Sequence, residues 1–321
     1  MGTAATDSRK CAICGQNCQV VLAGLRDDRF GAPGAYDIMK CLGCGLEQTM
    51  PRPTENELKA LYERFYNAGV DPGGTYQSWR ERFLASGVYR LWLQWDGDIS
   101  FHLPRGRGRL LDLGCNEGRG LSLYAANGFV AEGLEINEKA AALARQRGFQ
   151  VYTGTLEEFT APEPYEVVVL SNVLEHASDP VAMLAQVRRL LRPGGEVWIS
   201  CPNAESLWRH VFGRGWINWH VPYHLWHFSP RTLEEVLGRA GFRLRELQTF
   251  TPALWLAQSI CIRRGTGAGQ VSRLLRSAPA VAGLMLAARL MILPFFSRAD
   301  RRLRGDCLVA TAKVEQNPCA C

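Results

Sequence analysis

The sequence predicts an α/β fold built on a doubly wound, mainly parallel sheet. From Arg109 onward, short apolar runs alternate with segments of helical periodicity, which is the pattern of parallel strands joined by helices. The first such run, Arg109–Leu113, ends in the small residues Gly114–Gly118, and the chain then becomes helical. Backbone N–H groups at such a helix N-terminus face a bound ligand, and glycines let the main chain approach it.

The remaining elements follow from the same alternation. Strands are predicted at Arg109–Leu113, Val130–Ile136, Gln150–Thr153, Val167–Ser171 and Gly195–Cys201, with helices at Gly118–Asn127, Asn137–Arg147 and Pro180–Leu191. Leu191–Gly195 is predicted to be a tight turn, because Pro193 and the two glycines set its geometry. Phe242–Phe250 and Cys307–Val314 are expected to complete a sheet of seven strands as an antiparallel pair.

Length and composition describe an ordinary globular protein. The chain has 321 residues, 47% hydrophobic and 21% charged, which suffices for one large domain or two modest ones. No secretory signal is expected, because the N-terminal residues contain no apolar stretch of the kind that such signals have. Four of the eleven cysteines have metal-binding spacing, which favours a reducing compartment over export. A cytoplasmic protein is therefore expected.

Two C-x-x-C-G stretches mark the N-terminal fifty residues. The pairs Cys11/Cys14 and Cys41/Cys44 are each followed by glycine, which lets the backbone turn and donate N–H groups to sulfur. Four thiolates suit tetrahedral Zn²⁺ and leave no open position, so a structural zinc ion is predicted. Two disulfides in an exported protein are the alternative, and Cys18 is a nearby thiol that competes as a ligand.

The residues expected to bind a ligand follow the carboxyl ends of the strands, where such sheets hold their ligands. Glu135 ends the second strand, where a carboxylate accepts hydrogen bonds from two ribose hydroxyls, and Ile136 would pack on an adenine. Thr155-Leu156 and Asn172 follow the third and fourth strands. A solvated strand-end acid is the simpler explanation of Glu135 alone. Four successive strand ends together predict one shared site.

These stretches resemble the class I S-adenosylmethionine-dependent methyltransferases. The run Asp112-Leu-Gly114-Cys115-Asn116-Glu-Gly118 resembles their first motif, an acidic residue followed by Gly-x-Gly-x-Gly. Asn116 replaces the middle glycine, and asparagine tolerates the positive φ that glycine supplies. The run does not match the dinucleotide pattern G-x-G-x-x-G, which disfavours a nicotinamide or flavin.

Two later motifs strengthen the resemblance. Asn172-Val-Leu-Glu-His176 and Leu191-Arg-Pro-Gly-Gly195 resemble the group that includes the ubiquinone-pathway enzymes. Still closer is a bacterial group with an N-terminal zinc module, associated with sugar, polysaccharide or natural-product pathways. The resemblance implies a Rossmann-like seven-stranded methyltransferase sheet, in which Asp112, Gly114, Glu135 and Asn172 contact S-adenosylmethionine. The complete predicted cofactor site is Asp112, Gly114, Cys115, Asn116, Gly118, Glu135, Ile136, Thr155, Leu156 and Asn172.

A hydroxyl acceptor loses a proton on methylation, so a general base near neutral pKa is expected. Histidine suits this task, and the candidates are His176, five residues past the fourth strand, and His224, before the helix that opens at Ser229. Each has a structural alternative, loop capping for His176 and packing under a tryptophan cluster for His224. A metal site formed by His220, His224 and His227 is a further alternative, although a carboxylate ligand is missing nearby.

The segments outside the core carry other patterns. Thr54 and Glu57 have capping-box spacing at the start of a helical cap, whose later aromatic residues are expected to pack against another domain. The segment 252–304 carries nine arginines and one acid, so its net charge exceeds the +6 of the whole chain. Its apolar stretch Ala280–Leu293 would span roughly 21 Å as a helix, too short to cross a membrane.

That stretch suits peripheral contact of residues 265–300 with an anionic inner membrane face. A helix packed on its own domain or on a second subunit is the alternative. The predicted division is a zinc module (1–50), a helical cap or linker (51–103), a cofactor-binding core (104–251), a basic apolar insertion (252–304) and a final strand with a tail (305–321).

The function expected is methyl transfer from S-adenosylmethionine to a hydroxyl, or a carbon, of a small-molecule or saccharide acceptor, with lipid- or nucleotide-linked acceptors among the candidates. Two alternatives stay open, a silent methyltransferase-like binding protein and an RNA methyltransferase that docks its substrate through the zinc module. The fourth strand is not followed by Asn/Asp-Pro-Pro-Tyr, a pattern of enzymes that methylate base amines, so a nucleic-acid partner is disfavoured.

Overall fold

The computed structural model describes residues 10–66, 86–87, 102, 104–263, 283–290 and 303–315. The chain forms two compact units, each assembled from separate stretches of sequence. Unit 1 is made of Met1–Asp98, Ala204–His227 and Thr251–Asp306, and unit 2 of Ile99–Asn203, Phe228–Phe250 and Cys307–Cys321. The five-part division expected from the sequence stays a prediction.

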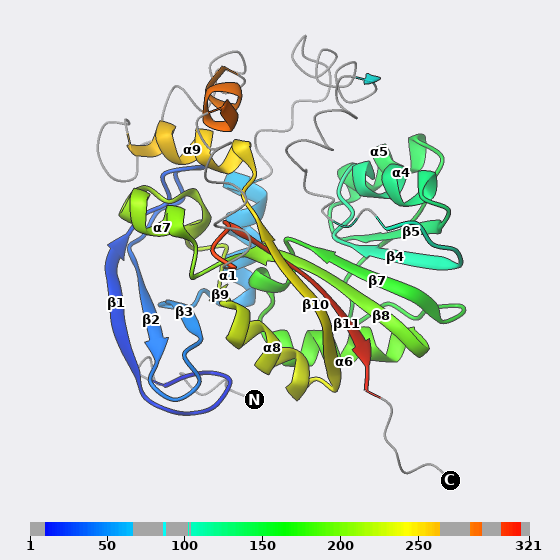
Figure 1. Cartoon of the computed structure of the whole chain (residues 1–321), viewed down its shortest axis with the longest axis horizontal. Coiled ribbons are helices and arrows are strands. Elements are labelled where there is room, and N and C mark those ends of the chain that lie inside the picture. Colours follow the sequence, from blue (N-terminus) through cyan, green and yellow to red (C-terminus); the bar gives the residue numbers. More distant parts are fainter. Residues whose placement is uncertain are drawn as a thin grey trace. The chain divides into compact units, whose positions relative to one another are not determined.

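Unit 2 is built on a seven-stranded mixed sheet with the order β10-β11-β8-β7-β4-β5-β6, which confirms the predicted fold class (Figure 1). The strands are β4 (Arg109–Leu113), β5 (Val130–Glu135), β6 (Gln150–Thr153), β7 (Tyr165–Ser171), β8 (Leu191–Pro202), β10 (Phe242–Phe250) and β11 (Cys307–Val314). The pairs from β6 through β8 are parallel, and β11 pairs antiparallel with both β8 and β10.

The strand order reverses at β4, which lies between β5 and β7. In open α/β sheets the crevice at such a switch point, outside the carboxyl ends of the strands, is where ligands bind. The loops after β4, β5 and β7 therefore occupy the position that the sequence predicted for the ligand site.

Four helices flank this sheet, and each begins as its sequence dictates. They are α4 (Arg119–Ala126), α5 (Glu138–Gln146), α6 (Pro180–Leu190) and α8 (Pro230–Arg239). Asn137 and Asp179 accept backbone N–H bonds at the starts of α5 and α6, and Ser229 forms a capping box with Thr232 at the start of α8. Figure 1 shows α4 and α5 along β4 and β5, and α6 and α8 on the other face of the sheet.

A buried cluster fills the space between α4, α5 and the sheet. It combines strand residues with the inner faces of both helices: Leu110, Cys115, Leu121, Tyr124, Phe129, Ala131, Ala141, Ala144, Val151, Val167, Val169 and Trp198. Gly133 of β5 leaves room for the loop after β4, since a Cβ there would lie 2.4 Å from Cys115 Sγ. The position of the glycine-rich loop therefore depends on a glycine in the neighbouring strand.

Unit 1 carries a second sheet, with the antiparallel order β1-β2-β3-β9. Its strands are β1 (Cys18–Leu25), β2 (Tyr36–Cys41), β3 (Glu47–Met50) and β9 (Trp226–His227). Its helices are α1 (Glu55–Leu61), which has the predicted Thr54–Glu57 capping box, α7 (Leu207–Phe212) and α9 (Ala253–Arg263). Sequence spacing gave no indication that β9 would pair with β3.

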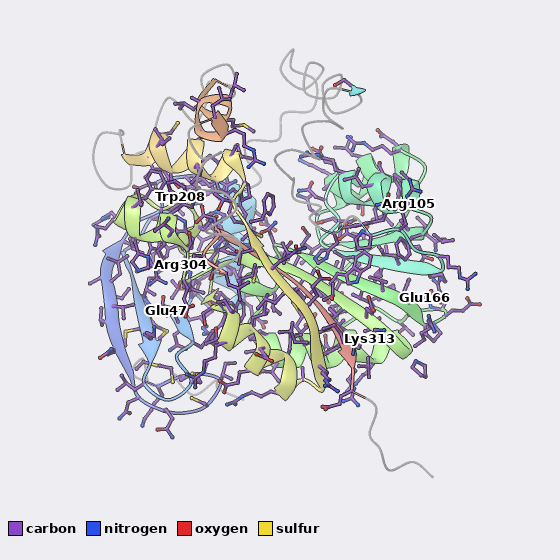
Figure 2. The ribbon with its side chains drawn as sticks, viewed as in Figure 1. Glu47, Arg105, Glu166, Trp208, Arg304 and Lys313 are labelled. Atoms are coloured by element: carbon purple, nitrogen blue, oxygen red, sulfur yellow. The ribbon has the colours of Figure 1, made fainter. Side chains whose placement is uncertain are left out.

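Ion pairing and aromatic packing hold these distant segments of unit 1 together. Glu47, labelled in Figure 2, is buried and forms an ion pair with Arg209 of α7 at 2.9 Å. The Arg209 guanidinium also lies 4.6 Å from the centroid of the Trp219 ring. A buried core of Leu25, Tyr36, Ile38, Trp216, Trp219 and Val221 packs beneath them.

One predicted turn is wrong. Leu191–Gly195 belongs to β8, because Leu191 already pairs with Tyr165 of β7. The next pair is Val167 with Glu196, so β8 advances five residues while β7 advances two. Pro193 and the glycines therefore create a bulge inside the strand rather than a turn before it. The predicted strand to Ile136 also ends one residue earlier, at Glu135.

Two predictions fall largely outside the described residues. The aromatic helical pattern around residues 79–95 is one, and most of the basic insertion is the other. Within the insertion the structure describes α9 and a helical stretch at 283–290. Among the described residues no helix combines the length and apolarity needed to span a membrane.

We expect Gly133→Ala to destabilise the protein by roughly 1–3 kcal/mol, since the added methyl group must displace Cys115 from a packed core. Gly238→Ala in α8 is the matched control. A Cβ at Gly238 meets nothing within 4 Å, and alanine should stabilise the helix by about 0.5–1 kcal/mol. Thermal unfolding of both variants measures the difference, and equal stability would contradict this account of the loop.

Candidate active site and metal centre

Glu135 organises the carboxyl edge of the parallel sheet. Its two carboxylate oxygens accept backbone N–H bonds from Asn116 at 2.9 Å and from Asn137 at 2.8 Å. Its own carbonyl accepts a bond from the N–H of Gly154, which follows β6. Glu135 thus joins the loops after β4, β5 and β6, and its carboxylate has a fixed orientation.

Asp112 is a second carboxylate beside Glu135. It lies on β4 and is only 4% exposed. Burial raises the pKa of Asp112 to about 8, and the negative charge of Glu135 raises it further in the same direction. A cation bound here would stabilise both carboxylates, so this edge of the sheet favours a positively charged ligand group.

The loop after β4 has the backbone geometry that its glycines predicted. Gly114, Asn116 and Gly118 have φ values of 68°, 49° and 77°. The Asn116 side chain accepts a hydrogen bond from the N–H of Glu117 at 2.8 Å, so asparagine stabilises its own left-handed conformation. Cys115 instead points into the core, and only its backbone is available to a ligand.

The predicted adenine-binding residues flank the same edge. Ile136 is 73% exposed directly after Glu135, which leaves an apolar surface for a flat ring. Thr155 N–H and Oγ1 both donate to the carboxylate of Glu158, and this fixes the turn after β6. Leu156 follows in that turn. A cavity of about 390 Å³ opens beside it, lined by Thr155 and by residues that the sequence did not suggest, among them Arg145 and Tyr152.

The loop after β7 contains Asn172 and His176. Asn172 has a φ of 55°, and its Oδ1 is buried without a hydrogen-bond partner among the described residues. Such an orphaned acceptor suits a ligand N–H group. His176 is half-buried at the end of a single 3₁₀ turn, Leu174–His176, where its backbone N–H bonds to the Val173 carbonyl.

The second predicted base, His224, belongs to unit 1. Its Nδ1 lies 2.8 Å from the Asn218 carbonyl and its Nε2 lies 3.2 Å from Nδ1 of His220. His227 makes a separate contact, between its Nε2 and Thr49 Oγ1 at 3.0 Å. Burial lowers the pKa of His227 to about 3, and nearby Arg209 lowers it further. The three side chains do not converge as a metal site among the residues described here.

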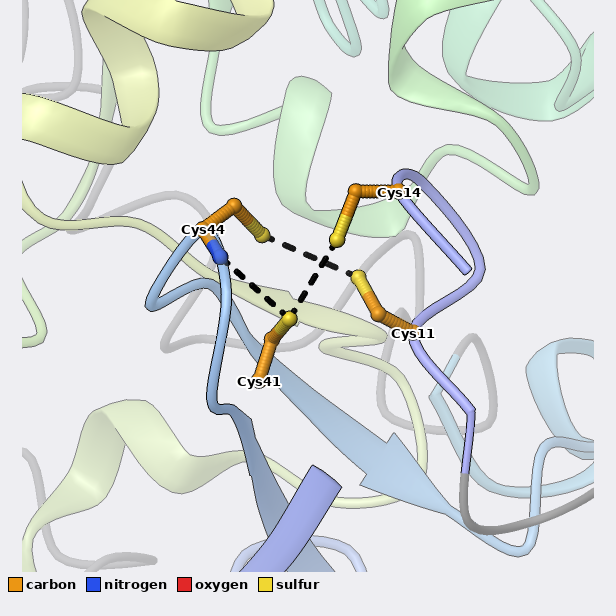
Figure 3. Close-up of side chains that lie close together, drawn as sticks. All are labelled: Cys11, Cys14, Cys41 and Cys44. Atoms are coloured by element: carbon orange, nitrogen blue, oxygen red, sulfur yellow. Dashed lines mark hydrogen bonds between the residues drawn. The ribbon is translucent and has the colours of Figure 1, made fainter. Parts of the chain in front are cut away.

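The four N-terminal cysteines do converge (Figure 3). The Sγ–Sγ distance is 3.8 Å for Cys11–Cys44 and 3.3 Å for Cys14–Cys41. Zn–S bonds of about 2.3 Å in a tetrahedron require sulfur atoms roughly 3.8 Å apart, so the set fits Zn²⁺. Disulfide bonds need about 2.05 Å, which these pairs do not approach.

The backbone around the sulfurs turns at the glycines, as the sequence predicted. Gly15 and Gly45 have the positive φ values of 72° and 81° that a sharp turn requires. Their N–H groups bond to the carbonyls of Cys11 and Cys41, whereas Gly43 and Cys44 donate to Cys41 Sγ at 3.4 Å. Backbone N–H groups of the second turn therefore donate to sulfur, as the sequence predicted.

Cys18 is distinct from the four cysteines. Burial raises the pKa of its thiol to about 12, and the neighbouring cysteines add to the effect. Metal ligands are thiolates, so this environment favours a protonated Cys18. The pKa of Cys41 is lowered to about 6, since backbone and side-chain hydrogen bonds outweigh its desolvation by burial.

A seven-stranded sheet with a switch point at β4, followed by a glycine-rich loop, is the arrangement that the sequence predicted for a class I S-adenosylmethionine-dependent methyltransferase. Residues 76–247 match the family model described as a methyltransferase domain. The chain belongs to this methyltransferase family, as its sequence motifs predicted.

Several known proteins are similar to the chain. A ubiquinone biosynthesis O-methyltransferase of Cereibacter sphaeroides is 32% identical over 177 residues, which cover 50% of this chain and 72% of that enzyme. An enzyme of the same description from Thiobacillus denitrificans is 28% identical over 173 residues, which cover 50% of this chain and 73% of that enzyme. A Burkholderia thailandensis 1,6-didemethyltoxoflavin-N1-methyltransferase structure has a TM-score of 0.47 and 16% identity, covering 88% of this chain and 97% of that chain.

Titration of Asp112 should make the ligand-free protein less stable as pH rises. Its folded-state pKa of about 8 lies above the ordinary value of about 3.9, so the folded protein holds the proton more tightly than the unfolded chain. The contribution of Asp112 to the free energy of unfolding therefore decreases as the pH rises from the lower of these pKa values to the higher, by up to ~1.4 kcal/mol per pH unit. Thermal unfolding from pH 6 to 7.5 should show a smaller loss for Asp112→Asn, and identical slopes would refute the assignment.

Proposed function

We propose that this methyltransferase transfers a methyl group to a hydroxyl oxygen of a small-molecule or saccharide acceptor. The observation that carries the choice of oxygen is the 32% identity to an enzyme described as an O-methyltransferase, across 72% of that enzyme. The site residues support the cofactor half of the reaction. When bound, S-adenosylmethionine would supply a methyl group on a positively charged sulfur. A hydroxyl oxygen would attack the methyl carbon in line and displace that sulfur.

In this proposal the chain binds and orients the cofactor through the loops that Glu135 joins. The Glu135 carboxylate retains lone pairs for the ribose hydroxyls while two backbone amides fix its direction. Ile136 would cover one face of the adenine, and Thr155 and Leu156 would contact its edge. Asp112 and the Asn172 amide oxygen suit the ammonium group of the methionine part, because a bound cation would favour the ionised form of Asp112 and the amide oxygen is an unsatisfied acceptor.

The remaining loop residues shape the approach of the cofactor. Gly114 admits no side chain without crowding Val173, since a Cβ would lie 3.0 Å from its Cγ2. At Gly118 a Cβ would lie 2.9 Å from Ala144 of α5. Cys115 and Asn116 contribute backbone atoms to the same surface. The loop is thus held close to β5 and α5, and its backbone is free to approach a ligand.

We also propose that Cys11, Cys14, Cys41 and Cys44 hold a structural Zn²⁺ ion. Their sulfur spacing and the N–H bonds to Cys41 Sγ support this assignment. All four tetrahedral positions are filled by protein, so the ion stabilises the module and takes no part in chemistry.

The cofactor assignment can be tested by measuring S-adenosylhomocysteine affinity by calorimetry. Glu135→Ala should weaken binding at least tenfold, because two charge-assisted hydrogen bonds are lost. Glu138→Ala, three residues later, is the matched control; Glu138 is an exposed acid that pairs with Arg145 and should leave affinity unchanged. Equal affinity in all three proteins would refute the assigned role of Glu135.

Turnover separates the enzyme from its alternatives. Radiolabelled S-adenosylmethionine should transfer its methyl group to members of a panel of catechols, free sugars and nucleotide sugars, with alkali-stable products as expected of ethers. Tight S-adenosylhomocysteine binding without transfer to any member would favour a silent binding protein. Transfer to RNA alone would favour the docking role of the zinc module.

Zinc can be tested by metal analysis of the purified protein. We expect one zinc ion per chain, and Cys41→Ser/Cys44→Ser should lose it together with several degrees of Tm. Cys18→Ser is the matched control and should retain the ion. Full zinc content in the double variant would overturn the assignment.

A further inference from the structure

The helical stretch 283–290 of unit 1 exposes the kind of face that a surface helix normally buries. Its exposed residues are Gly283, Leu286, Ala287 and Leu290, and the two leucines are 48% and 54% exposed. The spacing i, i+3, i+4, i+7 places all four on one side of the helix. In a helix that covers its own core, such an apolar stripe faces inward and polar residues face the solvent.

The buried residues of this stretch include its one charged side chain. Ala288 is 1% exposed and Arg289 is 5% exposed. Ala288 forms a buried cluster with Leu256 of α9, and Trp208 and Phe212 of α7 pack against that cluster. Figure 1 shows the stretch, in orange, beside α9. The helix is therefore anchored to unit 1 through Ala288, and its leucine face is left outside.

The neighbouring helix α7 exposes a second apolar pair. Leu207 and Val211, four residues apart, are 36% and 46% exposed. Single exposed apolar residues are ordinary, but two pairs on helices that share one buried cluster indicate an interaction surface. Neither α7, α9 nor the stretch 283–290 contains an acidic residue. The partner of this surface therefore meets apolar side chains without meeting negative charge.

Positive charge surrounds the same surface. The segment 252–304 contains nine arginines and one acid. Arg304, labelled in Figure 2, is exposed, and its carbonyl accepts a hydrogen bond from the backbone N–H of Leu207 at 3.0 Å. An anionic lipid surface satisfies both features, because leucine side chains enter the boundary between headgroups and acyl chains while arginines stay at the headgroups. A nucleic acid would neutralise the arginines but leave the leucines in water.

We propose that unit 1 docks on an anionic membrane surface through Leu286 and Leu290. This inference goes beyond methyl transfer and does not depend on the identity of the acceptor. The contact is peripheral: the eight described residues of the stretch rise only about 12 Å along the helix axis, far less than the ~30 Å of a hydrocarbon core. The helix would lie in the plane of the interface, with Ala288 toward the protein.

Vesicle flotation of the full-length protein tests the docking. We expect the protein to float with vesicles of phosphatidylglycerol and phosphatidylcholine, and to bind pure phosphatidylcholine vesicles at least tenfold more weakly. Added salt should weaken binding to the mixed vesicles, because it screens the arginines. A protein that stays unbound to the mixed vesicles at low salt would overturn the proposal.

Substitution of the two leucines tests the surface itself. Leu286→Glu/Leu290→Glu should weaken vesicle binding at least tenfold, with Tm and S-adenosylhomocysteine affinity unchanged because both side chains are exposed. Leu286→Trp/Leu290→Trp should retain binding, since tryptophan favours the membrane interface. Val20→Glu/Val21→Glu on β1 is the matched control, because these residues are 51% and 40% exposed in the same unit. An equal loss in both glutamate variants would contradict the role of the leucines.

Two other occupants of the surface give different results. A dimer in light scattering that Leu286→Glu/Leu290→Glu converts to a monomer, without vesicle binding, would replace the membrane with a second copy of the chain. Binding to single-stranded RNA but not to vesicles would replace it with a nucleic acid. None of these measurements needs a methyl acceptor, so failure of the proposed O-methylation would leave the docking proposal standing.

Discussion

The site depends on two backbone amides that hold the carboxylate of Glu135 in one orientation. Asn116 N–H and Asn137 N–H each hold one oxygen of Glu135, and they come from the loops after β4 and β5. The bond from Gly114 N–H to the Leu134 carbonyl joins the same loops one residue earlier. The turn after β4 thus has its shape before any ligand arrives, which lowers the ordering cost of binding.

This preorganisation has an energetic cost at Asp112. Burial and the neighbouring charge of Glu135 disfavour the ionised form of Asp112, and this electrostatic strain raises the pKa of Asp112. A positively charged cofactor relieves the strain, so energy stored in the free protein contributes to affinity for a cation. A stabilising substitution such as Asp112→Asn would therefore be expected to weaken the site, as is common where stability and function conflict.

Local rules explain how much the sequence could predict. The strands of the sheet, the capping box at Thr54, the helix start at Ser229 and the left-handed Asn116 each depend on a few neighbouring residues, and the structure has them all. The bulge in β8 depends instead on its register with β7, which glycine and proline alone do not specify. The pairing of β9 with β3 joins residues about 180 positions apart and leaves no local periodicity.

The N-terminal module and His224 both belong to unit 1. Cys41 and Cys44 enclose the turn between β2 and β3, and Thr49 of β3 donates a hydrogen bond to the His224 carbonyl at 2.6 Å. That bond uses the only hydroxyl proton of Thr49, so His227 must donate to it through Nε2. The ring of His227 is neutral because burial lowers its pKa to about 3. A metal ion that fixes this turn would therefore also fix the strand that holds the backbone of His224.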